Sequence, residues 1–247
     1  MDNMVDGVYI ILQARMNSER LPGKVMKSIG GKPMIGIMID RLKKSELPII
    51  LATSLNTEND VLADYARSLG ILVFRGSEEN VLERYYFAAK SVNARIVIRV
   101  TGDNPLLDGI LLRDHVDYFL SLNNPRAFLS TGLSETWPLG ISVEVFHFDL
   151  LEEAYHSTTK PSYLEHVTPY MLLNIPGDIK ILAPENNIHR YHYRLTVDTE
   201  ADFTLNSILI EDFGCDMKSI EEIIQIIDDN QDLILINRDV SQKSWDE

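Results

Sequence analysis

Short apolar runs alternate with helix-like segments through the first half of this chain. The apolar runs cover residues 8–12, 48–52, 71–74 and 95–100, and the helix-like segments that follow them cover 33–45, 57–69, 79–91 and 107–120. Neighbouring parallel strands need a crossover long enough to hold a helix, so this alternation is typical of a parallel sheet with helices on both faces. We therefore expect a three-layer α/β/α fold with a mostly parallel, Rossmann-like sheet.

The alternation becomes less regular from about residue 126. Strand-like residues 127–131 and 141–146 flank a turn-rich stretch at 132–140. Further along, the pattern indicates helices at 149–157, 162–173, 200–210 and 219–229, and strands at 179–183 and 192–197. Because no repeat or linker divides the chain, we expect one domain, 1–247, with an inserted subregion at about 132–190.

The charge balance limits the possible partners. The chain has 23 Lys and Arg against 37 Asp and Glu, a net charge of −14 and a pI near 4.8. Bulk binding of nucleic acid requires a basic face, so nucleic acid is excluded as a partner. Cys215 is the single cysteine, which prevents an internal disulfide and fits a reducing compartment. No apolar stretch approaches the ~20 residues that cross a bilayer, so we expect a cytoplasmic protein without a membrane partner.

Positive charge gathers in the loop that follows the first expected strand. This loop carries Arg15, Arg20 and Lys24 against one acid, Glu19, although acids dominate the rest of the chain. It contains neither G-x-x-x-x-G-K-[ST] nor G-x-G-x-x-G, so side-chain cations and the amides around Gly23 would have to hold phosphates. Three cations at a strand end favour a polyanion site such as a nucleoside triphosphate, and the alternative is a solvated surface loop.

Two aspartates also follow strand-like segments. Asp103 lies in the sequence Gly-Asp-Asn-Pro after residues 96–100, and Asp198 follows residues 193–197. Mg²⁺ prefers one or two carboxylates, with phosphates and water completing its shell, so this pair predicts a magnesium site beside the cationic loop. The alternative is that each aspartate caps the helix that comes after it.

These segments resemble known sequences. Residues 13–24, QARMNSERLPGK, resemble the nucleotide-binding loop of the sugar-acid cytidylyltransferases of the acylneuraminate and CMP-Kdo type. Residues 99–106, 165–170 and 194–202 are most similar to the branch called spore coat polysaccharide biosynthesis protein F. The similarity extends from about residue 9 to about residue 213, and it implies a fold of the nucleotide-diphospho-sugar transferase type.

The resemblance implies roles for individual residues. Asp103 and Asp198 would hold the catalytic Mg²⁺, and the loop that contains Ser77 and Asn80 would read the cytosine of CTP. The alternative for that loop is a helix cap by Ser77 with Asn80 at the third helical position. The nucleotide would be bound by the first loop and this one, through Gln13, Ala14, Arg15, Ser18, Arg20, Lys24, Ser77 and Asn80.

The acceptor sugar is expected to bind at two later segments, residues 138–144 and 165–168. We place its pocket at Gly140, Glu144, Glu165 and His166, although an adjacent Glu and His are commonly a surface pair on a helix. Arg99 lies within an apolar strand and should form a structural salt bridge, with Asp103 among its neighbours, and the alternative is a contact with the ligand. The resembling enzymes pair through this part of the chain, which predicts a homodimer.

Together these observations predict a Mg²⁺-dependent enzyme that joins CTP to a sugar acid and releases pyrophosphate, for surface or spore polysaccharide synthesis. Arg15, Arg20, Lys24 and Asp103 would be catalytic, and no side chain is identified as a general base. Two alternatives remain. A nucleotide-sugar glycosyltransferase would usually carry an Asp-x-Asp motif, which is missing at Asp103, and an inactive nucleotide-binding scaffold would not need both aspartates and three cations.

Overall fold

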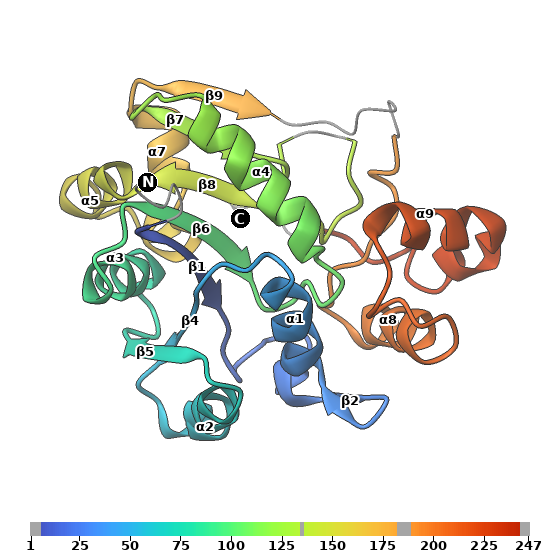
Figure 1. Cartoon of the computed structure of the whole chain (residues 1–247). Coiled ribbons are helices and arrows are strands. Elements are labelled where there is room, and N and C mark those ends of the chain that lie inside the picture. The colour runs from blue at the N-terminus through green and yellow to red at the C-terminus, as the bar shows by residue number, and fades with distance from the viewer. Residues whose placement is uncertain (1–5, 134–135, 182–188, 243–247) are drawn as a thin grey trace.

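A mixed sheet forms the central layer of the protein. The computed structural model describes residues 6–133, 136–181 and 189–242. Within these residues, seven strands form one sheet in the order β5-β4-β1-β6-β8-β7-β9 (Figure 1). Their bounds are β1 Val8–Gln13, β4 Ile49–Ser54, β5 Leu72–Gly76, β6 Ile96–Thr101, β7 Ala127–Ser130, β8 Glu144–His147 and β9 Asp178–Ile181.

The pairing divides the sheet into two parts. Strands β5, β4, β1 and β6 are all parallel, so their carboxyl ends share one edge. Strand β8 runs antiparallel to both β6 and β7, whereas β9 is parallel to β7. A small antiparallel ladder, β2 Ser28–Ile29 with β3 Lys32–Pro33, precedes the first helix. The mostly parallel α/β fold expected from the sequence is confirmed.

Helices cover both faces of the sheet, because alternate strand residues point to opposite sides. Ile10 and Leu12 of β1 join the core beneath α1 and α4, while Ile11 joins the core beneath α3 and α5. Figure 1 shows these two pairs of helices on opposite sides of the sheet. The helices are α1 Met34–Lys43, α2 Asp60–Ser68, α3 Val81–Ser91, α4 Gly109–Ser121, α5 Phe148–Ser157, α6 Pro161–His166, α7 Pro169–Asn174, α8 Glu200–Glu211 and α9 Ile220–Asp229.

Two elements differ from the expectation. The helix expected at 162–173 is divided into α6 and α7, because Val167 adopts a positive φ of 70° and ends α6, and α7 then begins at Pro169, which suits a first helical position. The strand expected at 192–197 is absent: in that segment one bridge, from Leu139 to Arg194, is the only strand-type pairing. The segment lies among loops rather than beside a strand, so its backbone amides donate hydrogen bonds to loop carbonyls, those of Leu139 and Asp103. The strand expected at 179–183 extends partly outside the described residues.

In the described part of the chain, no helix combines the length and apolar character needed to cross a membrane.

Candidate active site at the carboxyl ends of the parallel strands

The loop after β1 is folded so that the Lys24 side chain points inward. Gly23 adopts φ 71°, a left-handed conformation that suits glycine, and its amide donates to the carbonyl of Met16 at 2.8 Å. The amide of Met16 donates to Oδ1 of Asn59 at 2.8 Å, which fastens the loop to the segment after β4. A short 3-10 helix, Lys24–Met26, then begins, and Lys24 is only 8% exposed.

Lys24 brings the two expected metal ligands together. Its Nζ lies 2.9 Å from Oδ1 of Asp198 and 3.5 Å from Oδ2 of Asp103. It also donates to the carbonyl oxygen of Val197 at 2.6 Å. Two carboxylates separated by 95 positions therefore surround one cation at the end of the cationic loop.

Close backbone packing places Asp103. A Cβ on Gly102 would lie 2.8 Å from Cβ of Ala14, so glycine allows the loops after β1 and β6 to meet. The Thr101 hydroxyl donates to Oδ1 of Asp103 at 2.6 Å and fixes the carboxylate. The carbonyl of Asp103 accepts from the amide of Val197 at 2.8 Å, which brings the neighbouring Asp198 to the same place.

Asp198 lies in a cluster of positive charge. Its Oδ2 is 2.9 Å from Arg20 and 2.7 Å from Arg194, in addition to the contact between Oδ1 and Lys24. Burial opposes ionisation, but the three cations outweigh it and hold the pKa of Asp198 below its ordinary value. This carboxylate is therefore charged over the whole physiological range.

Neither aspartate caps a helix, so that alternative is wrong. Asp108 caps α4 by accepting from the amides of Ile110 and Leu111. Helix α8 is capped by Thr199, which forms a capping box with Asp202. Both helices have their own caps, and Asp103 and Asp198 remain at the site for another purpose.

The loop after β5 lies against the cationic loop, since Arg15 contacts Oε1 of Glu78 at 3.0 Å. Asn80 is itself the cap of α3, accepting from the amide of Glu83 at 2.9 Å. The hydroxyl of Ser77 accepts from the amide of Asn80 at 3.0 Å. The helix cap is therefore Asn80, three residues later than the Ser77 cap that the alternative expected. The amide oxygen of Asn80 is committed to the helix, whereas the loop itself remains beside the cationic residues.

The residues expected in the sugar pocket come from several elements. Glu144 is the first residue of β8, Glu165 is exposed on α6, and His166 is half-buried at the end of α6 with a pKa lowered mainly by burial. Gly140 has φ 103°, and a Cβ there would lie 2.5 Å from the amide nitrogen of Thr196. Gly140 thus allows the 139–141 segment to pack against the segment that leads to Asp198.

The partner expected for Arg99 is corrected by the structure. Nη1 of Arg99 donates to Oε2 of Glu144 at 2.6 Å, and the two residues are neighbours in the ladder between β6 and β8. The other oxygen of Glu144 accepts from the hydroxyl of Thr168 at 3.0 Å. A salt bridge does form, but its carboxylate belongs to a residue 45 positions away rather than to Asp103.

The other loop residues are placed by the backbone. Gln13 ends β1, its carbonyl accepts from the amide of Gly102 at 2.7 Å, and its side-chain Oε1 is buried without a partner among the described residues. Ala14 is buried between the loops, and the amide of Ser18 donates to the carbonyl of Met16 at 3.1 Å.

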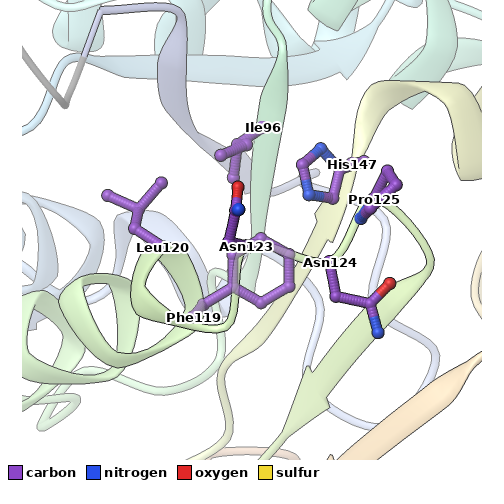
Figure 2. Close-up of a pocket in the computed structure, with 7 residues that line it drawn as sticks. All are labelled: Ile96, Phe119, Leu120, Asn123, Asn124, Pro125 and His147. Carbon is purple, nitrogen blue, oxygen red and sulfur yellow. The ribbon is translucent and has the colours of Figure 1, made fainter.

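A cavity of about 380 Å³ lies elsewhere, at the opposite end of β6. Figure 2 shows its lining side chains, Ile96, Phe119, Leu120, Asn123, Asn124, Pro125 and His147. Ile96 begins β6, whereas Asp103 follows the end of that strand, so this cavity is separate from the cationic site.

The comparisons with known proteins agree with this geometry. A family model described as cytidylyltransferase matches residues 9–240. The chain belongs to the cytidylyltransferase family. The chain is similar to the spore coat polysaccharide biosynthesis protein SpsF of Bacillus subtilis (strain 168). The two are 31% identical over 239 residues, which cover 92% of this chain and 97% of that protein. The family and its nucleotidyltransferase class, expected from the motifs, are thereby confirmed.

Solved structures of cytidylyltransferases share the fold. A cytidylyltransferase from Leptospira borgpetersenii serovar Hardjo-bovis superimposes with a TM-score of 0.86 at 30% identity, covering 96% of this chain and 99% of that one. A CMP:2-keto-3-deoxy-manno-octonic acid synthetase complexed with CTP superimposes with a TM-score of 0.61 at 17% identity, covering 83% of this chain and 98% of that one. The second likeness shows the fold alone.

Sequence reasoning overlooked several contacts of this cytidylyltransferase site. Glu78 holds Arg15, and Arg20 donates to the carbonyl of Ser241 at 3.2 Å. Arg194 donates to Gln242 at 2.6 Å, so the carboxyl-terminal segment reaches both arginines that hold Asp198. A local motif marks none of these contacts, because each joins segments that are far apart in the chain.

The carboxylate pair fits a shared magnesium ion. In the described residues no group of three or more His, Cys, Asp or Glu side chains forms a complete metal cage. Two carboxylates within reach of a single cation position are nevertheless what Mg²⁺ takes when substrate phosphates and water supply its other ligands. The Lys24 ammonium lies in that position.

Proposed function

We propose that this cytidylyltransferase transfers CMP from CTP to a carboxylated sugar, a nonulosonic or ulosonic acid, and releases pyrophosphate. The product would serve surface or spore polysaccharide synthesis, as the name of the related SpsF suggests. One observation carries the proposal: Asp103 and Asp198 converge on one cation position at the end of a loop that carries Arg15, Arg20 and Lys24. That arrangement joins a metal site to a polyphosphate site.

The cations of the loop are paired with acids. Arg15 contacts Glu78, Arg20 contacts Asp198, and Lys24 contacts both aspartates. These pairs keep the half-buried cations ordered and compensate their charge until phosphate oxygens replace the carboxylates. During the reaction, Arg20 and Lys24 would stabilise the charge that develops on the departing pyrophosphate.

Each carboxylate has its own support. Thr101 holds Asp103 in one orientation, and Arg194 holds Asp198 while remaining paired with the fully buried Asp202. Mg²⁺ bound between the aspartates would act as a Lewis acid on the α-phosphate and lower the pKa of the attacking sugar hydroxyl. Since such a transfer depends on positioning and electrostatics, it requires no dedicated general base.

The remaining assignments follow from position. The loop from Gly76 to Asn80 lies beside Arg15 and is proposed to read cytosine. We place the sugar between the Gly76–Asn80 loop and the inserted subregion at about 132–190. Gly140, Glu144, Glu165 and His166 would surround it. The same subregion of a single domain is proposed to form a homodimer.

The glycosyltransferase alternative is less well supported, since the family match is to cytidylyltransferases and Asp103 lacks an Asp-x-Asp motif. The inactive scaffold is also less well supported, because both aspartates meet Lys24, and Asp198 also meets Arg20.

Pyrophosphate release tests the proposal. Purified protein with Mg²⁺ would be assayed with CTP, UTP, ATP and GTP against a panel of ulosonic and nonulosonic acids, each with its neutral counterpart. We expect release with CTP and at least one acid, and none with Asp103→Asn. Release with neutral sugars alone would refute the sugar-acid proposal, and transfer of a sugar from a nucleotide-sugar would favour the glycosyltransferase.

A further inference from the structure

The junction between α6 and α7 contains an unusual turn. Val167 has φ 70° and ψ −60°, and the amide of Thr168 donates to the carbonyl of His166 at 2.8 Å. These angles and this bond describe a three-residue γ-turn of the strained kind. A β-branched residue is an outlier at positive φ, and Val167 is completely buried. Such a conformation persists only where the surroundings impose it, and it commonly marks a functional position.

The turn delivers the Thr168 hydroxyl to Glu144. The hydroxyl donates to Oε1 of that carboxylate at 3.0 Å, and both groups are buried. The other oxygen, Oε2, accepts from Nη1 of Arg99 at 2.6 Å. The Glu144 carboxylate therefore accepts from two partners, Thr168 in the turn between α6 and α7 and Arg99 on the neighbouring strand β6.

The pair of Arg99 and Glu144 does not take the strongest form of an ion pair. An arginine and a carboxylate that serve only structure commonly pair through two parallel bonds, because the two groups match in shape. Here Thr168 occupies the second oxygen of Glu144, and Arg99 is left with a single bond to it. Nε of Arg99 is buried without a hydrogen-bond partner among the described residues. A buried, unpaired donor is costly unless something else accepts from it.

Arg99 is also held on its remaining sides. Its guanidinium lies 5.8 Å from the ring centroid of the buried Tyr85, and 17% of its side chain is exposed. Burial opposes its charge, but Glu144 outweighs burial and raises the pKa of Arg99, so the group is always cationic. A fixed cation whose side chain is partly accessible is suited to a ligand carboxylate.

The position agrees with the chemistry of an ulosonic acid. In such a sugar the carboxylate is bonded to the same carbon as the attacking hydroxyl, so its receptor must lie close to the metal carboxylates. Arg99 is on β6, the strand that leads directly to Asp103, and the Asp103 charge contributes to its electrostatics. Other cations are less suited to this role. The loop cations are assigned to the phosphates of the nucleotide, and Arg190 is paired with Asp228.

We propose that Arg99 binds the carboxylate of the acceptor sugar, and that Glu144 and the turn at 166–168 position its guanidinium. Arg99 is then the residue that makes the enzyme select acids over neutral sugars. The inference rests on the proposed function, because it requires that the acceptor carry a carboxylate.

The test compares each acid with its carboxamide, which keeps the shape and loses the charge. Pyrophosphate release would be measured for the wild type, Arg99→Gln and Glu144→Gln. The wild type should prefer the acid in kcat/KM, and Arg99→Gln should reduce that preference by roughly 10- to 100-fold, the range for a hydrogen bond to a charged group. Glu144→Gln removes a competing anion, so it should lower the KM for the acid while the KM for CTP stays the same.

Thr168→Val tests the turn without altering charge. Without Thr168 to hold it, the Glu144 carboxylate can turn so that both oxygens bond to Arg99, so the KM for the acid should rise while the KM for CTP does not. Thr204→Val, in the exposed part of α8, is the matched control and should change neither. Circular dichroism and thermal unfolding would establish that each variant is folded.

The outcomes separate the two proposals. If the wild type turns over no sugar acid, the proposed function fails and this inference fails with it. If the wild type uses an acid but Arg99→Gln retains the full preference over the carboxamide, the inference alone is overturned. A Glu144→Gln variant that is merely less stable, with an unchanged KM for the acid, would likewise show that the pair is only structural.

Discussion

The ammonium nitrogen of Lys24 lies 2.9 Å from Oδ1 of Asp198. The same nitrogen lies 3.5 Å from Oδ2 of Asp103, so Lys24 lies where we propose that a divalent cation binds. Lys24→Met should therefore increase Mn²⁺ affinity in the absence of nucleotide by about tenfold, because a competing cation is removed. Electron paramagnetic resonance of free Mn²⁺ would measure it. Equal affinity in both proteins would contradict a shared cation position.

Asp103 and Asp198 should behave as one unit. Asp103→Asn and Asp198→Asn should each abolish most activity, and the double variant should be little worse than the worse single variant. The expectation is sharper now that Asp108 and Thr199 are known to cap the neighbouring helices, because loss of a cap cannot explain the defect. Rates measured across a Mg²⁺ titration decide the point, and near-normal rates in either single variant would remove that residue from the metal site.

The low pKa of Asp198 makes part of the stability depend on pH. A carboxylate whose pKa is lower in the folded than in the unfolded protein stabilises the fold above its unfolded pKa, and loses that effect as pH falls through the folded value. The ordinary value is 3.8 and the folded pKa lies below it. The difference in unfolding free energy between wild type and Asp198→Asn should be constant from about pH 7 to 5 and shrink below about pH 4. Urea denaturation at several pH values would show this, and a difference independent of pH would contradict it.

Arg41 is a buried arginine with a purely structural environment. It donates to the carbonyls of five residues, which belong to the loop after β6 and to the segment before α9: Leu106, Leu107, Cys215, Asp216 and Lys218. Arg41→Met leaves these carbonyls and Asp108 without their partner, and should lower the free energy of unfolding by roughly 3–5 kcal/mol. The control Arg67→Met breaks an exposed pair with Asp64 and should cost under about 1 kcal/mol. Similar losses in the two variants would show that burial of Arg41 contributes little.

Local patterns predicted the elements whose causes are local. The parallel strands of the first half are apolar on both faces, and the capping box of Ser219 and Glu222 marks the start of α9 correctly. The segment at 192–197 has a strand-like composition, yet its backbone meets the loops that contain Leu139 and Asp103. Which atoms lie beside a segment depends on the whole fold, and residue preferences do not contain that information.

The site also combines features that local sequence predicts with features that depend on the whole fold. Strand ends and charge reversal identified the cationic loop and both aspartates, because each signal lies within a few residues. The partner of Arg99 was wrong, since its carboxylate arrives from β8, which the sequence cannot place beside β6. The strained turn at Val167 was also missed, because valine strongly disfavours a positive φ and its presence does not predict one.

Asp198 and the segment that reaches Arg20 and Arg194 come from the last part of the chain. Synthesis on the ribosome proceeds from the amino terminus, so the cationic loop and Asp103 emerge long before their partners. The nascent chain can begin to assemble its parallel strands, but Lys24 has only one of its two carboxylates until residue 198 leaves the tunnel. A polypeptide that stops before residue 198 therefore contains the cationic loop and Asp103 without the second carboxylate of the proposed metal site.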